Sequence, residues 1–151
     1  ANIKLKEMAE SGPRDVALGD LVQGKRVVLF AVPGAFTPTC SMKHLPGFVE
    51  KAGELRSKGV DEILCVSVND AFVMGAWGQA NNAGGKVRML ADGNGELTKA
   101  VGLELDASGF GMGQRSQRYA MVINDGKVEK LFLEPGPGLS VSSADAVLAS
   151  L

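Results

Sequence analysis

The stretch of sequence that decides the fold is Val27-Val28-Leu29-Phe30-Ala31-Val32-Pro33-Gly34-Ala35-Phe36-Thr37-Pro38-Thr39-Cys40. Its first six residues are continuously apolar, which is typical of a strand covered on both faces. Pro33-Gly34 ends the strand, and the pattern from Cys40 to Lys58 is helical. We therefore expect a buried strand, a proline-rich loop and then a helix that begins at Cys40 and is kinked by Pro46.

The rest of the chain alternates strands with helices before it forms a hairpin. Further strands are predicted at residues 63–68, 87–90, 119–123 and 128–133, and further helices at 70–77, 97–101 and 144–151. Asn69-Asp70 and the pair Ser142 and Asp145 are the predicted caps of two of these helices. Asn124-Asp125-Gly126 is the predicted hairpin turn. This order predicts an α/β fold, with a mixed central sheet and helices on both faces, in one domain over residues 1–151.

Composition excludes several classes of function. With 45% hydrophobic residues in 151, the chain has enough apolar side chains for a core. The net charge of −1 gives no electrostatic reason to expect binding to nucleic acid or to an anionic membrane. No apolar run reaches the roughly 20 residues that span a bilayer. The start lacks an initiator Met and resembles no signal or transit peptide, which is consistent with a processed form.

The few cysteine and histidine residues narrow the chemistry. Cys40 and Cys65 are the two cysteines and His44 is the one histidine, which argues against a disulfide scaffold, a four-thiolate zinc site or a catalytic triad. We expect no metal and no organic cofactor. Cys40 at a helix start lies where free N–H groups and the helix dipole lower the pKa of a thiol. The sequence therefore favours chemistry by an activated cysteine.

The loop before Cys40 resembles that of the peroxiredoxins. Pro33, Thr37 and Cys40 fit the pattern P-x-x-x-T-x-x-C, and the string VPGAFTPTCSMKHLPGF is similar to the type II branch. The similarity continues through GVDEILCVSVNDAFVMGAW and RSQRYAMVINDGKV, and it is weakest before Gly19. The resemblance implies a thioredoxin-like fold and a thiol peroxidase that reduces hydrogen peroxide and organic hydroperoxides through a cysteine sulfenic acid.

The resemblance also implies a role for each site residue. Cys40 is expected to attack the peroxide, Thr37 to orient thiolate and peroxide, Pro33 to shield the thiolate, and Arg118 to reach across to Cys40. Arg115, three residues earlier, is the residue most easily confused with Arg118, and a surface position is the alternative for Arg118. His44 lies one helical turn after Cys40, where a local structural hydrogen bond is a more ordinary role than tuning the thiolate.

Cys65 has two interpretations. Its spacing of 25 residues from Cys40 and its CVSVNDAFVM context resemble a resolving cysteine, as in plastidial members of the family. A position in the middle of a strand is also compatible with an inert buried thiol. A disulfide needs Cα atoms within about 7 Å, which would require the first helical turn to unwind. In the second interpretation, glutathione or a glutaredoxin thiol attacks the Cys40 sulfenic acid directly.

The resemblance further implies partners and a compartment. Glutaredoxin, glutathione or thioredoxin is the expected reductant, a homodimer is the expected assembly, and the chloroplast stroma is the expected location, with the cytoplasm as the alternative. Phe36, Phe72, Trp77 and Phe110 are candidates for a core, a dimer surface or both. Two rival functions remain: a thiol–disulfide oxidoreductase, and a non-catalytic redox-sensing or chaperone-like module. The first is disfavoured because the chain lacks the C-x-x-C motif of such enzymes, with Thr37 in the place of the first cysteine.

Overall fold

The computed structural model describes residues 3–37, 43–135 and 139–151. Its strands are β1 (Lys4–Ala9), β2 (Gly12–Ala17), β3 (Arg26–Val32), β4 (Glu62–Ser67), β5 (Arg88–Ala91), β6 (Glu104–Asp106), β7 (Gln114–Ser116), β8 (Tyr119–Asn124) and β9 (Lys127–Leu133). Its helices are α1 (Leu18–Val22), α2 (Leu45–Ser57), α3 (Ala71–Ala80), α4 (Glu96–Val101) and α5 (Ala144–Ser150), with a 3-10 turn at Ser108–Phe110.

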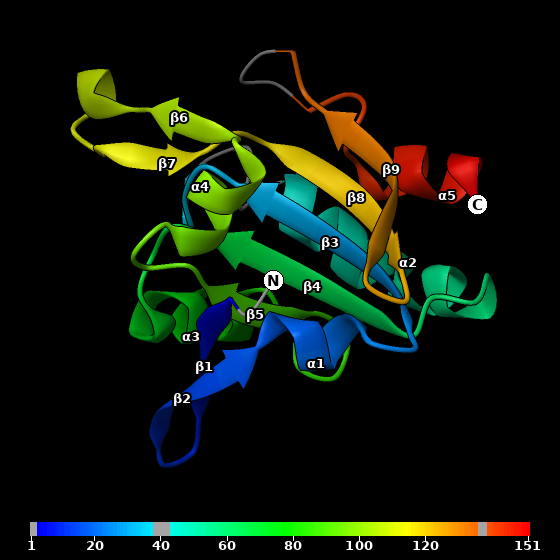
Figure 1. The fold of residues 1–151 in the computed structure, drawn as a ribbon. Coiled ribbons are helices and arrows are strands. Elements are labelled where there is room, and N and C mark those ends of the chain that lie inside the picture. Colours follow the sequence, from blue (N-terminus) through cyan, green and yellow to red (C-terminus); the bar gives the residue numbers. More distant parts are fainter. Residues whose placement is uncertain (1–2, 38–42, 136–138) are drawn as a thin grey trace.

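A seven-stranded mixed sheet forms the centre of the molecule (Figure 1). The strand order is β2-β1-β5-β4-β3-β8-β9, in which β3, β4 and β5 run parallel and the remaining neighbours pair antiparallel. The parallel strands are joined by α2 and α3, as the alternating pattern predicts. The α/β fold expected from the sequence is therefore confirmed, with β3 as one of the innermost strands.

Successive side chains of β3 enter two different cores. Val28, Phe30 and Val32 pack with α2, α3 and α5 on one face, whereas Val27, Leu29 and Ala31 pack with α1 and α4 on the other. This follows from the period of two in a strand, which needs apolar residues at every position when both faces are covered. Because β3 is held on both faces and both edges, the loop that follows it starts from a fixed point.

Two predicted helix starts differ in detail from the structure. Pro46 is the second residue of α2, where its missing N–H is tolerated, and it is preceded by a short π-helical segment at Lys43 and His44. The cap of α5 is Ser143, whose hydroxyl accepts from the N–H of Ala146, while the Ser142 hydroxyl donates to Glu134. Asp70 caps α3 as predicted and accepts from the N–H of Val73.

The predicted hairpin turn is present between β8 and β9. Asp125 and Gly126 have φ angles of 49° and 80°, the left-handed values of a type I′ turn, and only glycine adopts them without a steric cost. Two other hairpins, β1–β2 and β6–β7, were not predicted. The β6–β7 hairpin forms a separate small sheet that projects from one end of the molecule (Figure 1).

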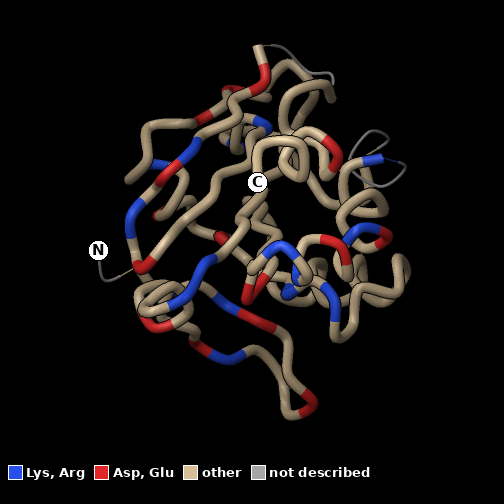
Figure 2. The backbone as a smooth tube through the Cα atoms, turned by 90° about the vertical axis from the view of Figure 1, so that its right-hand side faces the viewer, with Lys and Arg blue, Asp and Glu red and all other residues tan. Residues whose placement is uncertain are grey.

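Charged residues of both signs are spread over the molecule (Figure 2). Glu7 of β1 pairs with Arg14 at 2.7 Å and with Arg88 at 2.8 Å, which ties β1 to its neighbours β2 and β5. Hydrogen bonding to Arg88 lowers the pKa of Glu7 against the opposing effect of burial. Within the described ranges, no helix is long and apolar enough to cross a bilayer.

Candidate active site

The candidate site begins at the turn that leaves β3. Pro33 is half-buried, and the Thr37 hydroxyl donates to the carbonyl of Gly34 at 2.6 Å. Phe36, at the tip of this turn, has a φ of 63°, an unusual value for a bulky side chain, and it is more than half exposed. Cys40 itself lies outside the described residues. The structure thus places Pro33 and Thr37 together on one short turn three residues before Cys40.

Two side chains that the sequence did not assign to the site hold this turn in place. Asn69, at the end of β4, accepts from the N–H of Ala35 at 3.0 Å and from the Ser67 hydroxyl at 2.6 Å. Arg115, in β7, donates to the Pro33 carbonyl at 3.4 Å and to the Met112 carbonyl at 2.9 Å. From the sequence, Asn69 was predicted only to be part of a helix cap, and Arg115 was named only as the arginine most easily mistaken for Arg118. Asn69 follows the end of β4 by two residues, which is its one positional signal in the sequence, whereas Arg115 is the middle residue of the short strand β7.

There is little free space around the turn. A Cβ atom added at Gly34 would come within 3.0 Å of the Met112 side chain and 3.2 Å of the Arg115 guanidinium. Such contacts are tighter than ordinary van der Waals packing. The turn after β3 is therefore packed directly against the β6–β7 hairpin, and glycine at position 34 permits that approach.

Arg118 is buried, with 5% of its surface exposed, so a surface cation is the wrong interpretation. It precedes β8, whose residue Tyr119 pairs with Ala31 of β3. The next antiparallel step of this register places Arg118 beside Val32, immediately before Pro33. The Arg118 Nη1 atom lies 2.9 Å from Nδ1 of His44. The structure thus brings Arg118 to the same end of β3 as the Pro33–Thr37 turn.

His44 lies in an aromatic pocket between the sheet and α2. Its ring centroid is 4.8 Å from that of Phe30 and 5.6 Å from that of Phe48, and these two phenyl rings stack at 4.1 Å. Burial, reinforced by the nearby Arg118 charge, lowers the pKa of His44 to about 3, against the opposing effects of the Ser142 carbonyl and Glu134. The imidazole is therefore neutral at physiological pH.

Glu134 is a buried carboxylate at the end of β9 that sequence analysis missed. It accepts from the backbone N–H groups of Ser140, Val141 and Ser142 at 2.8–2.9 Å, and from the hydroxyls of both serines. Burial would raise the pKa of Glu134, but these hydrogen bonds lower it to about 2. The signal in the sequence is the cluster Ser140, Ser142 and Ser143 after an acidic residue, where donors for one carboxylate are concentrated.

Cys65 lies in the middle of β4, apart from the Pro33–Thr37 turn. It is fully buried in the core beneath α2 and α3, and it pairs with Phe30 of β3 and Met89 of β5. Because β4 is bonded on both edges, the Cys65 backbone has little freedom to move. Its approach to another cysteine therefore requires a change in the surrounding structure.

The buried pair His44 and Glu134 predicts loss of stability in acid. Between about pH 6.5 and pH 3 the unfolded chain binds a proton at His44 that the native protein does not bind. The free energy of unfolding should therefore fall by up to about 1.4 kcal/mol for each pH unit lost in this window. Below its ordinary value of 4.5, Glu134 adds a second loss in the same direction, because its native pKa is also depressed.

Urea unfolding at about pH 6.5, 6.0 and 5.5 measures this slope in a range where a glutamate of ordinary pKa 4.5 is still almost fully ionised in the unfolded chain, so that Glu134 contributes little. The variant His44→Phe keeps the ring contacts and removes the titrating group, so its slope should be flatter than that of the wild type. Equal slopes in the two proteins would contradict the assignment to His44.

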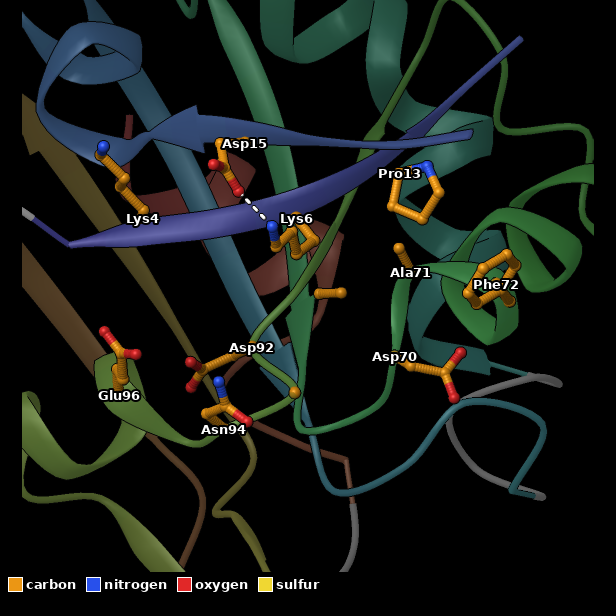
Figure 3. Close-up of a pocket in the computed structure, with 12 residues that line it drawn as sticks. Lys4, Lys6, Pro13, Asp15, Asp70, Ala71, Phe72, Asp92, Asn94 and Glu96 are labelled. Carbon is orange, nitrogen blue, oxygen red and sulfur yellow. Dashed lines mark ion pairs between the residues drawn. The ribbon is translucent and has the colours of Figure 1, made fainter. Parts of the chain in front are cut away.

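A pocket elsewhere on the molecule lies between the β1–β2 hairpin and the ends of β4 and β5 (Figure 3). Several of its polar groups already have partners: Lys6 pairs with Asp15, and Asp92 accepts from the N–H groups of Leu97 and Thr98. Asp70 is occupied as the α3 cap. Across the part of the chain that the structure describes, no group of three His, Cys, Asp or Glu residues is placed to hold a metal ion.

Comparison with known proteins agrees with this geometry. The Redoxin family model matches residues 2–148. The chain is 53% identical over 154 aligned residues to peroxiredoxin-2E-2, chloroplastic, of Oryza sativa, covering all of this chain and 68% of the relative. It is 57% identical to peroxiredoxin-2B of Arabidopsis thaliana, over 87% of this chain and 81% of that protein.

A solved structure gives the same result in three dimensions. Reduced Prx3 of Vibrio vulnificus, crystallised in complex with H₂O₂, superposes with a TM-score of 0.94 at 53% sequence identity, covering 99% of this chain and 94% of that one. Fold and relatives together define a thiol peroxidase with a thioredoxin-like fold. The chain belongs to the redoxin family and, within it, to the type II peroxiredoxins.

Proposed function

We propose that Cys40 is the peroxidatic thiol of this enzyme and that Pro33, Thr37 and Arg118 complete its active site. The observation that carries the proposal is the arrangement at the end of β3, where the turn that leads to Cys40 and the buried Arg118 lie together. A guanidinium at this point stabilises a thiolate, and its fixed charge and several N–H donors suit it to contact sulfur and peroxide oxygen. Pro33 keeps water from this side of the site.

The proposed reaction is a nucleophilic displacement at oxygen. The Cys40 thiolate attacks the terminal oxygen of the hydroperoxide, a new S–O bond forms, and the O–O bond breaks. The leaving alkoxide or hydroxide takes a proton and departs as alcohol or water, so sulfur is oxidised to sulfenic acid as the peroxide is reduced. Since the Thr37 proton is used by Gly34, its hydroxyl oxygen is left with a lone pair to accept from the peroxide O–H.

We propose that an external thiol, from glutathione, glutaredoxin or thioredoxin, resolves the sulfenic acid. The support is the position of Cys65, fully buried within a strand that is paired on both edges. Attack by Cys65 on Cys40 is the competing route, favoured by their spacing in the sequence. It requires the chain around one of the two cysteines to unfold locally.

Mass spectrometry of the intact protein after one equivalent of peroxide distinguishes these routes. We expect the wild type to gain one oxygen atom, trapped by a sulfenic-acid reagent, and to form a mixed disulfide when glutathione is added. Cys65→Ser should behave in the same way. A wild-type product that has lost two hydrogen atoms, and that does not form in Cys65→Ser, would instead assign Cys65 as the resolving cysteine.

Assembly and compartment belong to the same proposal. We infer a homodimer, supported by the aromatic side chains of Phe36, Phe72 and Phe110, which are 54%, 65% and 86% exposed, whereas Trp77 is part of the core. Exposed aromatic groups of this size are typical of interfaces. We place the enzyme in the plastid, as the name of the rice relative supports, and propose that residues 1–151 act as one domain.

A further inference from the structure

Four buried residues form a closed ring of hydrogen bonds: Arg118, His44, Ser142 and Glu134. Arg118 donates from Nη1 to Nδ1 of His44 at 2.9 Å. Because a guanidinium carries donors only, Nδ1 must be the acceptor and the imidazole proton must be on Nε2. The Nε2 atom lies 2.9 Å from the carbonyl oxygen of Ser142, and its N–H donates to that oxygen. Both nitrogens of His44 are thereby engaged.

Glu134 closes the ring from the other side. Its carboxylate accepts from the Ser142 N–H at 2.8 Å and from the Ser142 hydroxyl at 2.7 Å, while its own N–H donates to the Arg118 carbonyl at 3.0 Å. All four residues are at least 95% buried. A closed ring of buried hydrogen bonds restricts the side chains that form it. The ring therefore joins α2, the end of β9 and the loop before α5 to the residue that faces the active site.

We propose that His44 is a positioning residue that fixes the Arg118 guanidinium, and that the Glu134–Ser142 clasp holds His44 in the orientation and tautomer this requires. The proposal rests on the role of Arg118 given above. Arginine has several rotatable bonds, and a productive contact with a thiolate needs its fork held in one orientation.

The choice of a neutral partner has a chemical consequence. A carboxylate at 2.9 Å from Arg118 would compete with the thiolate for the same positive charge. A neutral imidazole anchors the guanidinium without offsetting that charge. The one carboxylate of the ring belongs to Glu134, which contacts Arg118 through its backbone N–H, while its carboxylate accepts from the N–H groups of Ser140, Val141 and Ser142.

Paired variants test whether His44 acts through Arg118. His44→Phe keeps the packing against Phe30 and Phe48 but removes both hydrogen bonds, and His44→Gln restores one acceptor and one donor. We expect His44→Phe to slow peroxide reduction by about tenfold and to shift alkylation of Cys40 to higher pH, as expected for loss of one hydrogen bond to a charged group. His44→Gln should recover part of the rate. Circular dichroism checks that each variant is folded.

The same substitution in an Arg118→Met background is the decisive comparison. If His44 acts by positioning Arg118, His44→Phe should cause no further loss once Arg118 is gone. An equal loss in both backgrounds would overturn the proposal, because His44 would then act independently. If Arg118→Met alone leaves the alkylation profile unchanged, the proposed role of Arg118 fails as well, and the two failures are told apart by this single-variant result.

NMR of the wild-type protein tests the tautomer of His44 without any substitution. Because His44 is the one histidine of the chain, its imidazole ¹⁵N resonances are assigned without ambiguity. They should report the neutral Nε2–H tautomer from about pH 8 down to about pH 5, where an ordinary histidine becomes protonated. An Nδ1–H tautomer, or protonation with a midpoint near the ordinary value of 6.5, would overturn the ring as described.

Discussion

Cys40→Ser should reduce peroxide turnover to the background rate of the assay, the largest effect expected of any single substitution in this chain. The reacting species is the thiolate, and a serine hydroxyl neither ionises near neutral pH nor forms a stable product with peroxide oxygen. No second cysteine is placed to replace it, because Cys65 is fully buried in β4. The loss should therefore affect the first chemical step and not only the recycling of the enzyme.

Single-turnover oxidation measures that first step without any reductant. The protein is mixed with a small excess of peroxide, and the peroxide remaining is followed with time. Cys65→Ser is the matched control, since it makes the same chemical change at the other cysteine and should retain the oxidation step. Peroxide consumption by Cys40→Ser at the wild-type rate would reject Cys40 as the nucleophile.

The parts of the fold that were predicted are those with strong local patterns. Residues 27–32 are a continuous apolar run, and residues 63–68 are apolar apart from Ser67. The two runs correspond to the central strands β3 and β4, whose residues are almost all inaccessible to solvent. The β1–β2 hairpin was missed because its strands bury few side chains, mainly Leu5 and Val16, between charged neighbours. The three-residue strands β6 and β7 are too short to give a period at all.

The candidate site likewise has residues that a local sequence pattern predicts and residues that it does not. Pro33, Thr37 and Cys40 are close in sequence, so their register alone indicates a reactive loop. The residues that form the ring with Arg118 are not neighbours of it in the sequence. His44, Glu134 and Ser142 come from separate elements of the fold and meet only after the sheet has formed. A sequence pattern indicates that a buried carboxylate or arginine needs partners, but only topology decides which residues they are. The hydrogen bonds of Asn69 and Arg115 to the turn after β3 follow the same logic.

Arg118→Met should slow peroxide reduction by roughly 10- to 100-fold, which corresponds to the 1.5–3 kcal/mol of a hydrogen bond to a charged group. Methionine approximates the volume of the buried side chain and removes its charge, so the Cys40 thiolate loses its cationic neighbour and the pKa of Cys40 should rise. The pH dependence of Cys40 alkylation measures this shift directly. Arg118→Lys should recover only part of the rate, because an ammonium keeps the charge but lacks the fork.

Arg26→Met is the control for the loss of one positive charge. Arg26 starts β3, at the opposite end from Pro33, and pairs with Glu129 at 3.6 Å. A long-range effect of net charge would act on both variants, whereas a local effect on the thiolate would appear in Arg118→Met alone. If both variants shift the alkylation profile equally, Arg118 has no special place beside Cys40. If Arg118→Met alone shifts it, the charge that stabilises the thiolate is the one placed at the end of β3.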